Sequence, residues 1–402
     1  MTDNVRMLWC SNGRMKKTGY GTQSNVWLPR VKRAGYDVWA FNVTENMGSP
    51  TVDQDGIPTL YKKLHVYGND VYAQHMEFSR AAFSLTLFNG WLLCEDHGKY
   101  PNVHWAPIDS NILRPDEDQN MRYSRWTWSM SRWGHEVLRD HGFDPVYVPH
   151  GIDSAIFKPI DRDEARANLQ KSIDQHEPAR GYPVDLNGKF IIAMVGANNI
   201  TPGRKGWFEM LRAFKVFNQR HPDSVMYWVT MMDKPDGVNL VKEIRYTDLP
   251  EGSFAYVNQY FHAQGMISDE WMNDLYNAAD VHALPSMCEG FGLPVMEAQM
   301  AGCPVVVSDG SALTEMCLSG HLVETQPFIA RRGWHWHMPI HDSLVEALEK
   351  AYQDRDNVTV RETAREKALA YDADTVFRQY MQPALRRITE ELGIEEGEAV
   401  TA

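Results

Sequence analysis

Residues 285–310 read PSMCEGFGLPVMEAQMAGCPVVVSDG, and this stretch carries the strongest pattern in the chain. Two acidic residues, Glu289 and Glu297, stand eight positions apart, with glycines and a proline between them. The run PVVVSDG that follows is apolar and β-branched, which predicts a buried strand. A glycine-rich turn next to such strands is a place where ligands bind in α/β proteins.

The proline marks the start of a helix. Pro294 fits a first helical turn, so we expect a helix that begins near Leu293 or Pro294 and ends before Gly302. Glu297 then lies one turn inside the helix, and Glu289 lies in the loop before it. Carboxylates accept hydrogen bonds from hydroxyl pairs, and free amides at a helix N-terminus bind phosphate or sugar hydroxyls. These groups suit a nucleotide sugar, although an acid in the first turn also stabilises any helix. The amides expected to face the same space are those of Gly290, Phe291 and Gly292.

Composition sets the broad class. The chain has 402 residues, enough for two domains, and its 43% hydrophobic and 23% charged residues are typical of a globular protein. We expect no signal peptide, since MTDNVRMLWCSN lacks a basic flank before an apolar core, and no membrane-spanning helix. The net charge of −13 weighs against a nucleic-acid acceptor without excluding it. Five cysteines without CxxC spacing predict free thiols in a reducing cytoplasm and no metal site.

Alternating apolar and amphipathic segments predict two successive doubly wound α/β halves. The first half opens with a strand (5–11), a turn at Gly19–Thr22, a helix (24–35) and a second strand (36–43), which together form a βαβ unit. We interpret 121–142 as two short helical pieces.

The second half opens with the apolar run 189–198, typical of a buried parallel strand, and a helix at 207–222. Ligands in such sheets bind beyond the carboxyl ends of the strands. The further expected elements are strands at 224–232, 254–260, 281–285 and 333–340, helices at 268–280, 311–318 and 342–354, and one or two long helices over 360–392.

Two further turns contain groups of the kind that bind anions. Arg204 and Lys205 follow a buried strand and precede a helix, so they are placed to hold a diphosphate, although an Arg-Lys pair is more often a solvated loop. The turn at Gly19–Thr22 allows backbone amides to approach an anion. A tight βα connection explains that turn equally well.

Taken together, these stretches carry a family resemblance. EGFGLPVMEA with AGCPVVVSDGSALTE resembles the donor-site signature of retaining glycosyltransferases of the GT-B fold, family four (glycosyl transferases group 1). DVHALPS, KGWFEMLRAFKVFNQRHPD, VYVPHGIDSAIFKP, SRWGHEVLRDHGF and GYGTQSNVWLPRVKRAGYDV are similar to further motifs of that family, in the family's order. The likeness covers nearly the whole chain.

The resemblance implies a role for each matching residue. Glu289 binds hydroxyls of the transferred sugar, and Glu297 holds the ribose diol. Arg204 and Lys205 neutralise the diphosphate leaving group, and Gly21 lets the N-terminal loop approach the phosphate. The remaining donor-binding residues are Gly290, Phe291, Gly292 and Leu293.

The sequence departs from the family pattern in three places. Ala197 follows the strand glycine where the family often has arginine, so Arg204 would substitute from the same loop. GSALTE keeps only one of two usual glycines before Glu315. The frequent N-terminal active-site histidine has no clear counterpart. VHWAPIDSNIL offers Asp109, which we prefer from the likeness of APID to a family variant, or His104, for which an ordinary loop role is favoured.

The implied fold class is α/β of the GT-B type, with two Rossmann-like doubly wound domains facing a central cleft. Residues 1–152 form the acceptor-side domain, onto which a helix at about 372–392 packs back. Residues 153–371 form the nucleotide-sugar-binding domain, and 393–402 form an acidic tail.

The implied function is that of a retaining, metal-independent hexosyl- or pentosyltransferase in the cytoplasm. It has no cofactor besides a nucleoside diphosphate sugar, and its acceptor is a glycan, lipid, small molecule or modified nucleic acid. The alternatives are another GT-B enzyme, such as an epimerase or phosphorylase, and a non-catalytic nucleotide-sugar-binding scaffold.

Two aromatic segments stand apart from these motifs. Tryptophans cluster between Trp126 and Trp133 and again at Trp334 and Trp336. Most of them are expected to pack in the core, while a few suit a pocket for a sugar or another ring. The histidines His335, His337 and His341 lack partners for a metal site, so we interpret them as structural.

Overall fold

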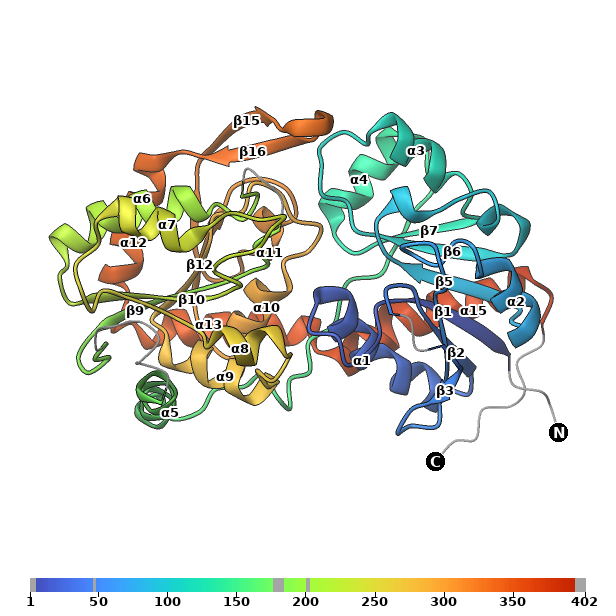
Figure 1. The fold of residues 1–402 in the computed structure, drawn as a ribbon, viewed down its shortest axis with the longest axis horizontal. Coiled ribbons are helices and arrows are strands. Elements are labelled where there is room, and N and C mark those ends of the chain that lie inside the picture. The colour runs from blue at the N-terminus through green and yellow to red at the C-terminus, as the bar shows by residue number, and fades with distance from the viewer. Residues whose placement is uncertain (1–4, 46–47, 176–183, 200–202, 395–402) are drawn as a thin grey trace. The chain divides into compact units, whose positions relative to one another are not determined.

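The computed structural model describes residues 5–45, 48–175, 184–199 and 203–394 (Figure 1). The chain divides into two compact units. Unit 1 comprises Met1–Gly151 and Tyr371–Ala402, and unit 2 comprises Ile152–Ala370. The boundaries expected from the sequence lie one residue further along the chain in both places. The predicted acidic tail at 393–402 falls almost wholly outside the described residues.

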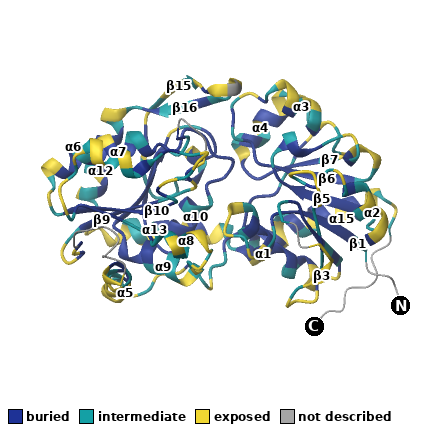
Figure 2. Ribbon diagram, viewed as in Figure 1, coloured by how far each residue is buried: buried dark blue, intermediate teal, exposed yellow. Residues whose placement is uncertain are grey.

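Unit 1 is built on an eight-stranded sheet of order β3-β4-β2-β1-β5-β6-β7-β8, in which only the pair β3 and β4 is antiparallel. Figure 2 shows that the middle strands of this sheet are buried. The strands are β1 (Arg6–Ser11), β2 (Asp37–Asn42), β3 (Thr51–Val52), β4 (Pro58–Tyr61), β5 (Phe83–Leu87), β6 (Asn102–Ala106), β7 (Trp126–Ser129) and β8 (Val146–Tyr147).

The helices of unit 1 connect these strands, and the C-terminal segment returns to the same unit. The expected one or two long helices over 360–392 are observed as two, Val358–Ala368 and a continuous helical run from Ala373 to Glu391 that contains a π-helical turn at Phe377–Met381. Asp372 caps a new helix there by accepting hydrogen bonds from two backbone amides. The helices are α1 (Gly19–Arg33), α2 (Tyr72–Ser79), α3 (Pro115–Met121), α4 (Arg132–Asp140), α14 (Ala373–Val376) and α15 (Gln382–Glu391).

Two expectations for unit 1 were wrong. Gly19–Thr22 is not a turn but the first turn of α1, because Thr18 caps the helix with its hydroxyl, 3.2 Å from the Gly21 amide. The segment 121–142 contains only one of the two expected helical pieces, α4, because residues 126–129 form β7. The residues WTWS pair with β6 in parallel, and tertiary pairing favours these aromatic and β-branched residues as a strand.

Unit 2 is built on a six-stranded, wholly parallel sheet of order β11-β10-β9-β12-β13-β14. A two-stranded antiparallel sheet of β15 and β16 lies beside it. The expected strand at 333–340 is β16. Its partner β15 and the edge strand β14 were not predicted, because apolar and polar residues do not alternate clearly along either of them. The strands are β9 (Phe190–Val195), β10 (Ser224–Val229), β11 (Phe254–Tyr256), β12 (Val281–Leu284), β13 (Val305–Ser308), β14 (Gly320–Val323), β15 (Thr325–Ile329) and β16 (His335–Pro339).

Helices cover this sheet, and its central strands form the core. Val305, Val306 and Val307 of β13 have no exposed surface, as expected for a parallel strand buried on both faces. None of the described helices is long and apolar enough to cross a membrane. The helices are α5 (Arg162–Asp174), α6 (Trp207–Arg220), α7 (Leu240–Thr247), α8 (Gln259–Ala263), α9 (Asp269–Ala278), α10 (Leu293–Met300), α11 (Leu313–Met316), α12 (His341–Gln353) and α13 (Val358–Ala368).

Candidate active site

The strand order of unit 2 places two loops side by side. From β9 the chain steps outward through β10 to β11, and β12 then pairs with the other side of β9. The loops that follow β9 and β12 therefore leave the same edge of the sheet in opposite directions. Such a switch point is where open α/β sheets bind ligands. These two loops contain the predicted residues Arg204, Lys205 and Glu289.

Close backbone packing holds the two loops together. Gly206 adopts a left-handed conformation (φ 76°) at the start of α6. A Cβ atom at this position would overlap the carbonyl oxygen of Pro285 and lie 2.9 Å from its carbonyl carbon. The amide of Met287 donates a hydrogen bond to the carbonyl of Arg204 at 2.8 Å. Glycine is thus required at 206, and the contact sets the position of the neighbouring Lys205.

Lys205 and Glu289 form an ion pair across the two loops. The Lys205 ammonium donates to Oε1 of Glu289, and the Ser286 hydroxyl donates to the same oxygen at 2.6 Å. Nη1 of Arg204 lies 3.5 Å from Oε2 of Glu289 and also donates to the carbonyl of Cys288. The side chains of Glu289, Lys205 and Arg204 are 9%, 13% and 18% exposed, so the pair is largely but not fully desolvated.

The charge state of Glu289 follows from this geometry. Burial raises the pKa of its carboxyl group, but the adjacent Lys205 and Arg204 lower it by more, to about 2. The carboxylate therefore stays ionised at neutral pH and acts only as a hydrogen-bond acceptor. This fits the expected contact with sugar hydroxyls and argues against a role as general acid.

The backbone of Glu289 is fixed by a residue that the sequence analysis missed. Its amide donates to Oγ of Ser311 at 3.0 Å. Ser311 adopts a left-handed conformation (φ 59°), which residues other than glycine rarely do. A strained serine of this kind carries no local sequence signal, because its role depends on a partner more than twenty positions away.

The stretch 285–310 contains the expected helix, which is α10. Gly292 precedes the helix in a left-handed conformation (φ 90°), and its carbonyl accepts hydrogen bonds from the amides of Val295 at 3.0 Å and Met296 at 3.3 Å. Glu297 lies one turn inside and is 9% exposed. The hydroxyl of the fully buried Tyr276 donates to Oε2 of Glu297 at 3.0 Å. Burial and the adjacent carboxylate both raise the pKa of Tyr276, so its hydroxyl remains a donor that orients Glu297.

The structure therefore gathers part of the predicted set in unit 2. It brings Arg204 and Lys205 against Glu289. Glu297 follows on the helix that begins after the same loop. The loop residues Gly290, Phe291 and Gly292 are buried, and Leu293 is half-buried. The contacts of these groups with a donor remain predictions.

Gly21 lies in unit 1, and the structure gives it a packing role. A Cβ atom there would overlap the carbonyl oxygen of Lys16 and lie 2.9 Å from that of Gly13. The loop after β1 thus folds directly onto the start of α1. The neighbouring Tyr20 donates to Oδ1 of Asn89 at 3.0 Å and so joins this loop to the one after β5. The approach of Gly21 to a phosphate stays a prediction.

The two candidates for the N-terminal active-site residue occupy different surroundings. His104 is a fully buried residue of β6, and its Nε2 is bonded to the carbonyl of Phe88 at 2.9 Å. Burial lowers the pKa of His104 to about 4, so the ring is neutral. Asp109 is half-buried in the loop after β6. This placement matches an ordinary structural role for His104 and leaves Asp109 as the candidate.

Glu117 is a second acidic residue near Asp109, and its burial was not predicted from the sequence. It is 4% exposed on α3, and its Oε2 lies 3.7 Å from Nε of Arg114. Burial raises the pKa of Glu117 to about 7, with a further contribution from the negative charge of Asp109. Its position in an acidic helix start (PDED) gave no reason to expect burial.

Glu117→Gln is expected to stabilise the protein at pH 8 by about 1–3 kcal/mol and to be nearly neutral at pH 4.5. Since the folded pKa lies above the ordinary value of 4.5, the folded state keeps its proton while the unfolded state loses it, and stability falls as the pH rises from 4.5 through about 7. Glutamine does not titrate, so the Glu117→Gln variant does not lose stability over this pH range. Urea unfolding at both pH values measures the difference, with Glu136→Gln, whose side chain is 66% exposed, as the control. An equal effect of Glu117→Gln at both pH values would contradict the assignment.

Comparison with known proteins supports a glycosyltransferase fold. Residues 187–369, which carry the Lys205–Glu289 pair, match the family model described as Glycosyl transferases group 1. The D-inositol 3-phosphate glycosyltransferase of Rhodococcus erythropolis is 30% identical over 203 residues, which are 47% of this chain and 40% of that protein. The match thus spans less than half the length of this curated relative.

Solved structures resemble the chain over almost its full length. The sucrose-phosphate synthase of Thermosynechococcus elongatus has a TM-score of 0.72 at 16% identity and covers 97% of this chain and 100% of its own. An Anabaena protein solved in complex with UDP and glucose has a TM-score of 0.67 at 16% identity, with coverages of 96% and 100%. The expected fold class, α/β of the GT-B type with Rossmann-like units, is confirmed.

Proposed function

We propose that this protein is a retaining glycosyltransferase that moves a sugar from a nucleoside diphosphate sugar to an acceptor hydroxyl. The observation that carries the proposal is the Lys205–Glu289 pair, with Arg204 beside it, at the switch point of unit 2. One carboxylate and two cations at this point match a sugar hydroxyl next to a diphosphate. The match of residues 187–369 to glycosyl transferases group 1 supports the same reading.

The chemistry requires a good leaving group. The bond between the anomeric carbon and the diphosphate oxygen breaks, and the nucleoside diphosphate leaves with an added negative charge. Lys205 and Arg204 stabilise that charge from fixed positions, which is the kind of electrostatic preorganisation that lowers such barriers. The acceptor hydroxyl attacks the anomeric carbon from the same face, and its proton passes to the departing phosphate oxygen.

The acidic residues bind rather than transfer protons. Glu289, ionised at neutral pH, accepts hydrogen bonds from hydroxyls of the transferred sugar. Glu297, oriented by Tyr276, holds the ribose diol. The start of α10, with Gly292 in its left-handed conformation, offers amides to the sugar or phosphate.

The finer points of the proposal come from the family resemblance. They are retention of configuration, a hexose or pentose as the transferred group, and independence of metal ions and cofactors. The cytoplasmic location is part of the same proposal and fits the free state of all five cysteines. Turnover in the presence of EDTA measures the metal requirement directly.

The decisive experiment measures nucleoside diphosphate release from UDP, GDP and ADP sugars, with and without hydroxyl acceptors, alongside thermal-shift binding. We expect one donor class to raise the melting temperature and to release its nucleoside diphosphate. Binding without release under all acceptor conditions would support a non-catalytic scaffold instead. Release that survives Glu289→Ala and Lys205→Ala would refute the site assignment.

A further inference from the structure

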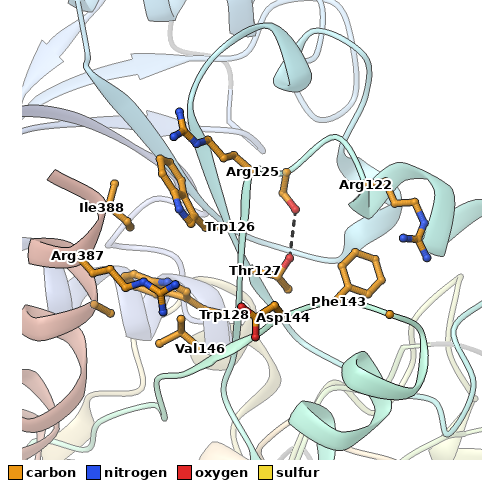
Figure 3. Close-up of a pocket in the computed structure, with 13 residues that line it drawn as sticks. Arg122, Arg125, Trp126, Thr127, Trp128, Phe143, Asp144, Val146, Arg387 and Ile388 are labelled. Atoms are coloured by element: carbon orange, nitrogen blue, oxygen red, sulfur yellow. Dashed lines mark hydrogen bonds between the residues drawn. The ribbon is translucent and has the colours of Figure 1, made fainter. Parts of the chain in front are cut away.

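Unit 1 contains a pocket (Figure 3). It lies at the edge of the sheet opposite to the loops of Gly21 and Asp109. Its volume is about 330 Å³. Trp126 and Val146, the first residues of β7 and β8, line it together with α15. The pocket is therefore at the amino ends of the strands. It is distinct from the carboxyl-end loops where the reaction is proposed to occur.

Two aromatic rings form walls of this pocket. Figure 3 shows Trp126 and Phe143 on either side of Thr127. The guanidinium of Arg125 lies 4.5 Å from the ring centroid of Trp126, and that of Arg122 lies 4.7 Å from the ring of Phe143. Each ring is thus held from one side by a cation–π contact. The indole N–H of Trp126 is also fixed, because it donates to a carboxylate of α15 at 2.7 Å.

Most of the positive charge around the pocket is already neutralised. Arg122 pairs with Asp118 at 2.7 Å. Arg387 pairs with Glu391 at 2.9 Å. Both are pairs four residues apart within or at the end of a helix. The arginines therefore do not create the excess of positive charge that a nucleic acid or another polyanion requires.

The remaining two charges are opposite in sign. Arg125 and Asp144 line the pocket, and neither is within ion-pair distance of an opposite charge among the residues that the structure describes, although the charge of Arg125 contributes to lowering the pKa of Glu391. A carboxylate accepts hydrogen bonds and a guanidinium donates them. A neutral ligand rich in hydroxyl groups can satisfy both at once, whereas an anion would be repelled by Asp144.

We infer that this pocket binds a neutral carbohydrate. The apolar face of a pyranose ring packs on Trp126 and Phe143, its hydroxyls donate to Asp144, and they accept from Arg125. The pocket is of the size that small ligands occupy. Because it lies away from the carboxyl-end loops, the bound sugar is an anchored part of a glycan and not the reacting group. Saccharide binding in this pocket does not depend on the donor-site proposal, whereas the anchoring role rests on the proposed function.

The test is ligand-observed NMR and calorimetry of the full chain with glucose, galactose, mannose, maltotriose and cellotriose, and with inorganic phosphate as the anionic probe. We expect at least one saccharide to bind and Asp144→Asn to weaken that binding about tenfold, since a charged hydrogen-bond acceptor is lost. Asp140→Asn is the matched control, because Asp140 is exposed at the end of α4 and does not line the pocket. Phe143→Ala is expected to weaken saccharide binding by a similar factor, because it removes one of the two aromatic rings that line the pocket.

Three results would overturn the inference. The first is that none of these saccharides binds. The second is saccharide binding that is unchanged by Asp144→Asn but lost in Lys205→Met, which places the sugar at the donor site. The third is binding of phosphate in place of the saccharides, with loss in Arg125→Gln, which makes the pocket an anion site. Thermal melts of Asp144→Asn and Phe143→Ala separate lost binding from lost folding.

Discussion

Lys205→Met is expected to lower turnover by about 100- to 1000-fold, because it removes a cation placed to stabilise the departing diphosphate. It is also expected to destabilise unit 2 by about 2 kcal/mol. Breaking a buried ion pair costs about 3–5 kcal/mol, and Arg204 and Ser286 keep part of the stabilisation of Glu289. Nucleoside diphosphate release and urea unfolding measure the two effects.

The effect on stability should depend on pH in a defined direction. The pKa of Glu289 in the folded protein is about 2, below its ordinary value of 4.5. The stability that this carboxylate contributes is therefore present above pH 4.5 and is lost as the pH falls toward 2. The stability gap between the wild type and Lys205→Met should narrow over the same range. The control is Lys242→Met, because Lys242 is exposed on α7. Wild-type turnover in Lys205→Met would refute the role of this lysine.

Gly206→Ala is expected to be the most disruptive small substitution in the site. The added Cβ would overlap the carbonyl oxygen of Pro285, and the left-handed conformation (φ 76°) disfavours any residue with a side chain. The loop must then move away from 285–289, which separates Lys205 from Glu289. We expect a stability loss of about 2–4 kcal/mol and a fall in turnover of about 100-fold.

Gly188→Ala provides the matched control for this prediction. Gly188 also has a positive φ (64°), but a Cβ there meets nothing within 4 Å. Its substitution should cost about 1 kcal/mol from backbone strain alone and leave turnover unchanged. If Gly206→Ala behaved like Gly188→Ala in both measurements, the contact between the two loops would not be what positions Lys205.

Several features of the site were predictable because their signals are local. Pro294 and Gly302 bracket α10, so the helix was expected within one residue of its observed start. The apolar run at β9 and the glycines around Lys205 similarly indicated a buried strand followed by a loop. These patterns reflect backbone preferences and burial, which act over a few neighbouring residues.

Other features depended on contacts between distant residues. Residues 126–129 were expected to be helical, and they form β7 because only pairing with β6 makes WTWS a strand. The roles of Ser311 and Tyr276, whose hydroxyls contact Glu289 and Glu297, were not expected. Nothing in the sequence near Glu117 indicated that it is buried near Asp109. Polar residues of these types are usually exposed, so their burial follows from the packing of other segments around them.

Local sequence patterns specify the kinds of groups in this protein. These are two acids beside a glycine-rich helix start, a basic loop after a buried strand, and two successive α/β halves. Which of these groups meet depends on the tertiary structure. The order of strands brings the loop of Lys205 to the loop of Glu289, and the resulting ion pair keeps that carboxylate charged. Electrostatic effects of this kind depend on distance and burial in space, which the order of residues along the chain does not specify.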